Sequence, residues 1–272
     1  MALRRPRVRI PLGPLQYTNT KDAIINHIQG VFVLIISNQI SRRITMRFED
    51  CNWMDIENYL KHDDRVICIT GACEQHAYLS LLTDVRIPLA LADAASKETG
   101  ILVAPVVNFG ISPYFLNYPG TISLRVSTLL HVVEDLISSL YHQGFRRFLF
   151  LNGHGGNDPV KGKLNEILNS YSDLKINWYS WWQSHSLEKI AIEKGLKPAH
   201  ANWLEAFPFT KVTDLPETEK APPYYQGLLS AEQTKIVFSD GSFGGAYETD
   251  DATMNEIFYA AYLDIINLIK FE

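Results

Sequence analysis

The chain has 272 residues, of which 46% are hydrophobic and 20% are charged, and its formal net charge is −5. This length can bury one substantial core, and the composition is ordinary for a soluble globular protein. The acidic balance argues against nucleic-acid binding over the whole surface, and no apolar run approaches the length of a transmembrane helix. The three cysteines, an odd number without CxxC spacing, favour a reducing compartment. We therefore expect a cytoplasmic protein with neither nucleic acid nor a membrane as a partner.

The first 45 residues differ in composition from the rest. Four arginines precede the first acid, and three prolines interrupt regular structure; these residues are Arg4, Arg5, Arg7, Arg9, Pro6, Pro11 and Pro14. The alternatives for this stretch are a transit peptide, which would be richer in serine, and a translation start at Met46. We expect residues 1–45 to form a poorly ordered or loosely attached extension, and residues 46–272 to form a single domain.

From Trp53 onward, strand-like apolar runs alternate with amphipathic helical patterns. In chain order, we predict a strand at Arg65–Thr70, a helix at Ile87–Thr99, a strand at Ile101–Val107, a helix at Thr128–His142, a strand at Phe148–Leu151, a helix from Asp158 to Leu168 with Asp158 as its N-cap, a strand at Ile176–Trp182, a helix at Ser186–Lys194 and a last helix from about Asp250. Residues 211–226, rich in proline, threonine and charge, are a candidate loop or lid. The alternation predicts an α/β protein with a mostly parallel sheet covered by helices on both faces.

Polar side chains gather directly after two of the predicted strands. Glu74 and His76 follow the first strand and lie two positions apart, so in an extended segment both can face one site. Asp84 comes ten residues after Glu74, which is far enough for a loop to fold back. Imidazole and carboxylate groups suit a divalent cation, and one carboxylate can bridge two cations. The alternative is that Glu74 and Asp84 are ordinary surface acids.

The stretch Asn152-Gly-His-Gly-Gly-Asn157 follows the third predicted strand. Its three glycines around His154 allow a sharp turn and a close approach to a ligand. A phosphate-binding loop and a plain strand-to-helix turn are the alternatives, but the Lys-Ser/Thr of a P-loop does not follow. Because ligands of open α/β sheets bind at the carboxyl ends of strands, we expect this segment and the Glu74 segment to share a site.

A third polar stretch contains His200 and Glu205, and we interpret residues 198–205 as a helix start. Five positions apart, the two side chains would not stack on a straight helix. They could converge if His200 lies in the preceding loop.

Together these segments resemble the creatininase (creatinine amidohydrolase) family, from about Met46 to the C-terminus. The motifs that carry the resemblance are Gly71-Ala-Cys-Glu-Gln-His76, Thr83-Asp84, Phe109-Gly-Ile-Ser112, Tyr118-Pro-Gly-Thr121, Asn152-Gly-His-Gly-Gly-Asn157 and His200-Ala-Asn-Trp-Leu-Glu205. The resemblance implies a three-layer αβα catalytic domain and a homo-oligomer, usually a hexamer. It also implies two divalent metal ions per chain (zinc, manganese or iron) and hydrolysis of a C–N amide bond in a small molecule.

The resemblance also implies roles for individual residues. Glu74, Asp84 and His154 match ligands of one metal, and His76 and Asp84 match ligands of the other, with Asp84 bridging. His200 matches the family's proton donor to the leaving nitrogen. The matches near the substrate are Ser112, Gly155 and Trp203.

This sequence departs from the family pattern at the glycine-rich loop. Creatininases carry a glutamate two residues after the loop histidine and an aromatic residue one after it, but Gly156 and Gly155 stand here. Glu205 could supply the missing ligand or act as a base. Creatinine is therefore a doubtful substrate, and we expect a different cyclic amide or a formamide.

Two rival functions stay open at this point. Cys73 or Ser112 could act as a nucleophile, although Glu74 beside Cys73 would raise the pKa of the thiol, and no GxSxG elbow surrounds Ser112. The missing glutamate at Gly156 leaves room for a non-catalytic ligand-binding or scaffold protein that kept the fold.

Overall fold

The computed structural model describes residues 45–272, so the expectation of an N-terminal extension lies almost wholly outside the described residues. Within the described part, a four-stranded sheet has the order β2-β1-β3-β4 and every pairing is parallel. The strands are β1 (Arg65–Thr70), β2 (Leu102–Val103), β3 (Arg147–Asn152) and β4 (Lys175–Ser180). The predicted α/β class with a parallel central sheet is thus confirmed.

The two central strands divide their side chains between two hydrophobic clusters. In β1, Ile67 and Ile69 join the cluster on one face, whereas Val66 and Cys68 join the cluster on the other. β3 alternates in the same way, because successive side chains of a strand point to opposite faces. Both strands are buried over their last five residues, which is the pattern of a parallel sheet covered on both sides.

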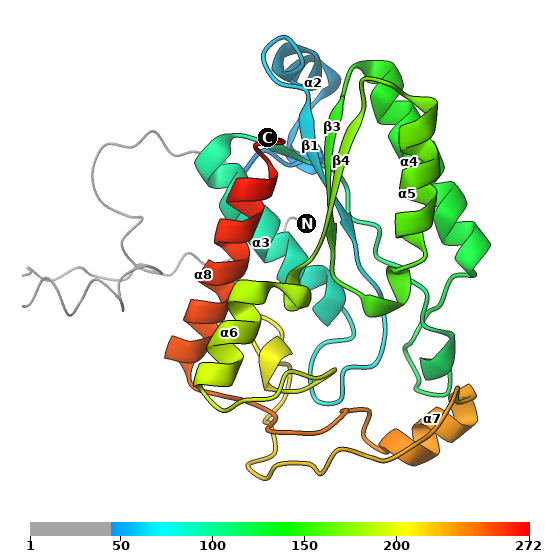
Figure 1. Cartoon of the computed structure of the whole chain (residues 1–272), viewed down its shortest axis with the longest axis vertical. Coiled ribbons are helices and arrows are strands. Elements are labelled where there is room, and N and C mark those ends of the chain that lie inside the picture. The colour runs from blue at the N-terminus through cyan, green and yellow to red at the C-terminus, as the bar shows by residue number, and fades with distance from the viewer. Residues whose placement is uncertain (1–44) are drawn as a thin grey trace, which may run out of the picture. The chain divides into compact units, whose positions relative to one another are not determined.

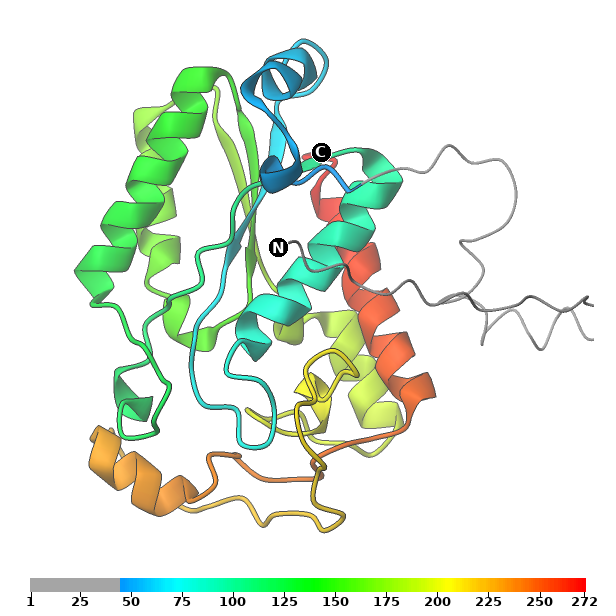
Figure 2. The same cartoon turned by 180° about the vertical axis from the view of Figure 1, so that it is seen from behind.

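Helices cover both faces of this sheet and form the outer layers (Figures 1 and 2). One layer holds α3 (Thr83–Thr99), α6 (His185–Glu193) and α8 (Asp251–Leu268), and the other holds α4 (Val126–Gln143) and α5 (Val160–Ser170). The remaining helices are α2 (Trp53–Tyr59), α7 (Ala231–Phe238) and the 3₁₀ turns η1 (Phe48–Asp50), η2 (Pro113–Phe115), η3 (Gly155–Asn157), η4 (Trp181–Gln183) and η5 (Trp203–Glu205). No helix among residues 45–272 has the length and apolar character to cross a membrane.

The structure differs from the sequence predictions mainly where strands end. β2 has only two residues of the predicted Ile101–Val107. Beyond it, the backbone N–H groups of Ala104 and Val107 still donate to the β1 oxygens of Ile67 and Ile69, and Val107 forms an isolated bridge with Thr70. β4 ends at Ser180, before the predicted Trp182, because the chain turns there into η4.

Helix starts also differ from the prediction. Asp158 does not cap α5, because a 3₁₀ turn comes first and Pro159 takes the N-cap position; Asp158 pairs with Lys161 instead. α3 begins at Thr83 rather than Ile87, so Asp84 lies in its first turn. The predicted helix start at 198–205 is a loop followed by the three residues of η5.

Candidate metal centre

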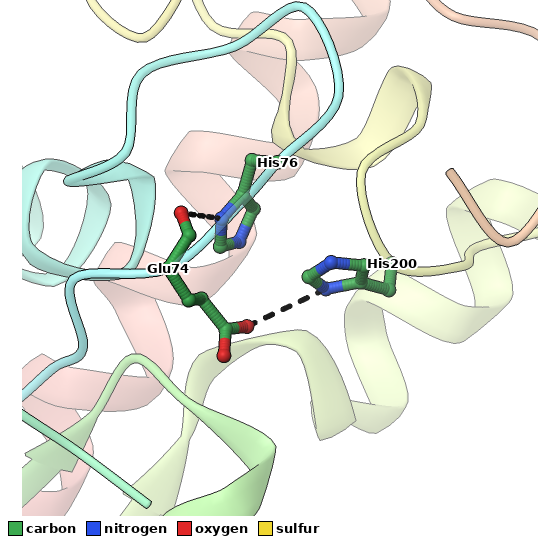
Figure 3. A group of neighbouring side chains, drawn as sticks. All are labelled: Glu74, His76 and His200. Carbon is green, nitrogen blue, oxygen red and sulfur yellow. Dashed lines mark hydrogen bonds and ion pairs between the residues drawn. The ribbon is translucent and has the colours of Figure 1, made fainter. Parts of the chain in front are cut away.

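Three loops at the carboxyl ends of the strands bring the predicted polar side chains together. One loop joins β1 to α3, a second joins β3 to α5, and the third ends in η5. Glu74, His76, Asp84 and His154 are almost completely buried. Three overlapping groups of their side chains, with those of His200 and Glu205, have possible ligand atoms within 4.8 Å of one another. One of these groups, Glu74, His76 and His200, is shown in Figure 3.

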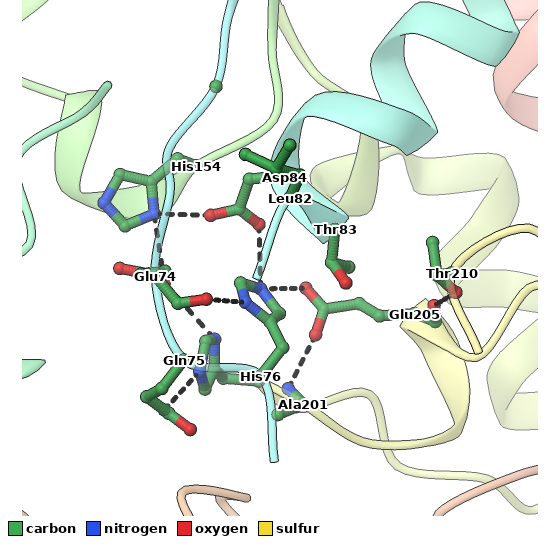
Figure 4. Close-up of polar contacts among 12 residues, drawn as sticks. Glu74, Gln75, His76, Leu82, Thr83, Asp84, His154, Ala201, Glu205 and Thr210 are labelled. Atoms are coloured by element: carbon green, nitrogen blue, oxygen red, sulfur yellow. Dashed lines mark hydrogen bonds and ion pairs between the residues drawn. The ribbon is translucent and has the colours of Figure 1, made fainter. Parts of the chain in front are cut away.

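Glu74, Asp84 and His154 form the second group (Figure 4). His154 Nδ1 lies 3.3 Å from Oε1 of Glu74 and 3.0 Å from Oδ2 of Asp84. The other ring nitrogen, Nε2, lies 3.0 Å from the backbone oxygen of Ile111. Because a carbonyl can only accept, Nε2 carries the proton, and the Nδ1 lone pair faces two carboxylates.

The third group consists of His76, Asp84 and Glu205. As in the second group, a backbone oxygen lies beside one ring nitrogen of the histidine, and carboxylates lie near the other. His76 Nδ1 lies 3.2 Å from the backbone oxygen of Glu74, to which it donates. His76 Nε2 lies 2.9 Å from Oδ1 of Asp84 and 3.8 Å from Oε1 of Glu205. A backbone acceptor that fixes one ring nitrogen and leaves the other free is the usual support of a metal-binding histidine.

Buried atoms without partners at the centre of these groups indicate that a cation fits. Oε2 of Glu74, Oδ2 of Asp84 and Nε2 of His76 have no hydrogen-bond partner. Leaving a buried polar atom unpaired costs about 1–3 kcal/mol and more for a charged group. Oxygen and imidazole nitrogen suit zinc, manganese or iron, so the donor set is chemically appropriate for divalent ions.

The electrostatics of the cluster show the same demand for positive charge. Burial opposes a charge on His76, but Asp84 and Glu205 outweigh burial and raise its pKa to about 10. His154 is also opposed by burial, yet Glu74 and Asp84 hold its pKa well above the ordinary value. Burial raises the pKa of Glu205 to about 7, and the negative charge of nearby Asp84 contributes to this rise. In the absence of metal, protons would supply the charge that these carboxylates require.

Position 156 has no room for a side chain. A Cβ at Gly156 would lie 2.0 Å from the backbone oxygen of Ile111 and 2.4 Å from Nε2 of His154. The glutamate that creatininases carry at this position could not be accommodated in this loop. Glu205 arrives from η5 instead, where its Oε2 accepts a hydrogen bond of 2.6 Å from the backbone of Ala201.

His200 lies in the loop before η5, which is why it and Glu205 converge despite their spacing. Its Nδ1 is 3.9 Å from Oε1 of Glu74. Its ring stacks on Phe115 with centroids 4.9 Å apart, and it lies 4.5 Å from the ring of His76. Burial and the neighbouring His76 lower the pKa of His200 to about 4.

A cavity of about 440 Å³ opens beside the cluster. Glu74, Asp84, His154, His200 and Glu205 line one part of it. Apolar and aromatic residues line the rest, chiefly Tyr114, Phe115, Trp182, Tyr225, Phe238 and Phe243. This volume lies within the range of small-molecule sites.

The predicted substrate contacts differ in their placement. Gly155 lines the cavity. Ser112 is completely buried outside the lining, with its Oγ 3.2 Å from Nε2 of His154. Trp203 is a core residue, fully buried, whose indole donates to the backbone oxygen of Lys197. A direct substrate contact is therefore not supported for Ser112 or Trp203.

Sequence reasoning missed two contributions to the site. The backbone oxygen of Ile111 fixes the His154 ring, and no residue type signals such a role. Gln75 contacts His200, and its place between Glu74 and His76 was a signal that could have drawn attention to it.

Comparison with known proteins places the chain in a family. The profile of the creatininase family (creatinine amidohydrolase) matches residues 49–269. The chain belongs to the creatininase family. A solved structure, "Creatininase Mn", superposes with a TM-score of 0.68 at 23% identity, over 83% of this chain and 98% of that one, and shows the shared fold.

Curated relatives match only in part. A 3-dehydro-scyllo-inosose hydrolase from Thermotoga maritima is 24% identical over 48% of this chain and 44% of the relative. A mycofactocin precursor peptide peptidase from Mycolicibacterium smegmatis is 34% identical over 34% of this chain and 40% of the relative. The chain thus spans less than half the length of the curated relatives that it matches.

Proposed function

We propose that this protein is a metal-dependent amidohydrolase that cleaves a C–N amide bond of a small molecule with water. The observation that carries the proposal is Asp84, whose two oxygens face the ring nitrogens of His76 and His154. Membership of the creatininase family and the hydrolases among the partial relatives support it.

In this proposal the cluster holds two divalent ions, zinc, manganese or iron. Glu74, Asp84 and His154 hold one ion, and His76, Asp84 and Glu205 hold the other, with Asp84 shared. When bound, such ions lower the pKa of water towards 7 and polarise a carbonyl. The alternative role for Glu205 is that of the base, because burial raises its pKa and so suits it to accept a proton from water.

His200 is the group that we place beside the leaving nitrogen of the substrate. It lines the cavity and its ring is held against Phe115. An amide nitrogen leaves poorly without a donor, so His200 supplies a proton or a hydrogen bond there.

The cavity also suggests what the rest of the substrate is like. Neither lysine nor arginine lines it, and the sequence has no arginine after Arg147. Nearby Lys220 is held by Asp240 and by the backbone oxygens of Phe238 and Ser242. We therefore propose a cyclic amide or formamide with an uncharged, flat substituent that packs against the aromatic walls.

Elemental analysis followed by a panel of cyclic amides and formamides tests the proposal. We expect about two metal equivalents per chain, chelator-sensitive hydrolysis of at least one amide, and a His200→Ala variant that keeps its metal but loses most of its turnover. Near-normal turnover in that variant would remove His200 from the mechanism.

The second candidate function is a non-catalytic ligand-binding or scaffold protein, and the substitution of glycine for glutamate at position 156 favours it. It predicts purified protein without metal, even after incubation with zinc, manganese or iron. Metal content therefore separates the two functions before any substrate is known. The homo-oligomer and the cytoplasmic location remain predictions.

A further inference from the structure

The side chain of Gln75 lies buried between the metal cluster and the segment that follows α7. Its Oε1 accepts a hydrogen bond of 3.1 Å from the backbone N–H of Ala77, and its Nε2 donates one of 3.1 Å to the backbone oxygen of Gly241. Gly241 has φ +102°, and a Cβ there would lie 1.7 Å from Oε1 of Gln75. The amide is thus held from both sides.

These two backbone partners determine which end of the amide is the NH₂. A reversed amide would turn its NH₂ toward the N–H of Ala77 and its oxygen toward the oxygen of Gly241, and both contacts would be lost. The NH₂ therefore also faces His200, whose Nε2 lies 2.9 Å from Nε2 of Gln75. Since the amide NH₂ can only donate, Nε2 of His200 must accept, and the ring proton resides on Nδ1.

Nδ1 is the ring nitrogen of His200 on the side of the cluster, as Figure 3 shows. The ring cannot turn over freely, because Phe115 stacks on it and Phe243 lies 4.9 Å away from it between centroids. The backbone N–H of Phe243 also donates to the backbone oxygen of His200. One N–H bond of a neutral imidazole is therefore directed to the cluster side.

We propose that Gln75 is a positioning residue that holds His200 as the neutral Nδ1–H tautomer. His200 then takes part in the reaction as a hydrogen-bond donor through Nδ1, a step that rests on the amidohydrolase function proposed above. This role, the donation of a hydrogen bond, is more limited than the transfer of a proton to the leaving nitrogen that family resemblance implies. An imidazolium at His200 would turn an Nε2–H toward the NH₂ of Gln75, and two donors cannot bond each other.

Nitrogen-15 NMR of histidine-labelled, zinc-loaded full-length protein tests the proposal without any substrate. The His200 signals are identified as those missing from a His200→Asn variant. We expect a protonated Nδ1 and an unprotonated Nε2 in the wild type. Gln75→Glu places an acceptor beside the ring and should protonate Nε2. Gln75→Met, with no donor, should release the tautomer preference, and Gln143→Glu on the exposed end of α4 should change nothing.

If Gln75 variants fold poorly, Gly241→Ala offers a second way to displace the amide while keeping its chemistry. A protonated Nε2 in the wild type, or the same tautomer in the wild type, Gln75→Glu and Gln75→Met proteins, would overturn the proposal. With an amide that the panel identifies as a substrate, Gln75→Met should lower kcat by about tenfold or more and change KM little. This decrease in kcat should be smaller than the decrease seen when a catalytic hydrogen-bond donor itself is removed. If no amide is cleaved but the tautomers behave as stated, the positioning role stands and the proposed reaction fails.

Discussion

His154 Nδ1 lies 3.0 Å from Oδ2 of Asp84, although His154 follows β3 and Asp84 lies in the first turn of α3. The parallel order of β1 and β3 makes this contact possible, since both strands end at the same edge of the sheet. The opposite oxygen of Asp84 lies 2.9 Å from Nε2 of His76. A single carboxylate thus belongs to both candidate ligand groups, so its loss should affect both of the proposed ions.

Asp84→Asn should therefore bind less than about half the metal of the wild type, because each ion loses a charged ligand. Glu74→Gln should lose chiefly one equivalent, since Glu74 belongs with His154 rather than with Glu205. Elemental analysis of the purified variants after dialysis against the metal measures both effects. His185→Gln, which changes a highly exposed histidine, is the matched control and should keep full occupancy.

Metal removal should lower the thermal stability, because the buried oxygens of Glu74 and Asp84 then lack a partner. At a free metal concentration of a thousand times Kd, binding stabilises the folded state by about 4 kcal/mol. For a domain of this size, that corresponds to roughly 10 °C in Tm. Calorimetry with and without a chelator measures it, and the melting temperature of Asp84→Asn should respond much less to the chelator. Equal shifts in both proteins would mean that the ion sits elsewhere.

The sequence predicted the layers and the ligand types for different physical reasons. Strand–helix alternation is local in the chain, so the parallel sheet followed from periodicity. The convergence of Glu74 and His154 followed from the rule that strand ends share an edge. Trp203 could not be assigned in this way, because an aromatic side chain suits a core as well as a pocket, and only packing decides. The short β2 was missed because an apolar run does not reveal where pairing stops.

Ser112→Ala separates a nucleophile from a buried supporting residue. Ser112 Oγ lies 3.2 Å from His154 Nε2, a contact that resembles a serine–histidine pair. That nitrogen already donates to Ile111, so it cannot accept the proton of the hydroxyl. We expect kcat to fall by less than about tenfold, whereas the loss of a true nucleophile costs on the order of 10⁶. Steady-state kinetics of the variant measures this effect. A very large loss of kcat with unchanged metal content would support Ser112 as the nucleophile.

Asp63 should make the fold sensitive to acid. It accepts hydrogen bonds from the backbone and side chain of Arg65, and it pairs with Arg147 at 3.3 Å. Burial favours its neutral form, but these bonds outweigh burial and lower the pKa of Asp63. Because the pKa of Asp63 is lower in the folded state than in the unfolded state, where it is near 3.9, its charge stabilises the fold at pH values above the unfolded pKa. This stabilisation is lost as the pH falls through the folded pKa. Because the group is partly exposed, we expect about 1 kcal/mol or less.

Urea unfolding at pH 7 and at successively lower pH measures the contribution of Asp63. Asp63→Asn should be less stable than the wild type at neutral pH and should lose less stability on acidification. Asp135→Asn on the exposed face of α4 is the control and should follow the wild type. Parallel pH curves for all three proteins would show that Asp63 contributes nothing.

The neighbouring glycines 155 and 156 should respond to alanine in opposite ways. A Cβ at Gly155 meets only the Trp182 ring, at 3.9 Å, so Gly155→Ala should fold and bind metal normally. A Cβ at Gly156 would clash with the Ile111 oxygen and with His154, so Gly156→Ala must displace the loop. Overpacking of this kind costs about 1–3 kcal/mol, and here it should also remove the ion that we propose at His154. Tm and metal content, measured on both variants, test this. A Gly156→Ala protein with full metal occupancy would show that the loop can accommodate a side chain at position 156. Lack of space would then not explain why the family's glutamate is absent from this chain.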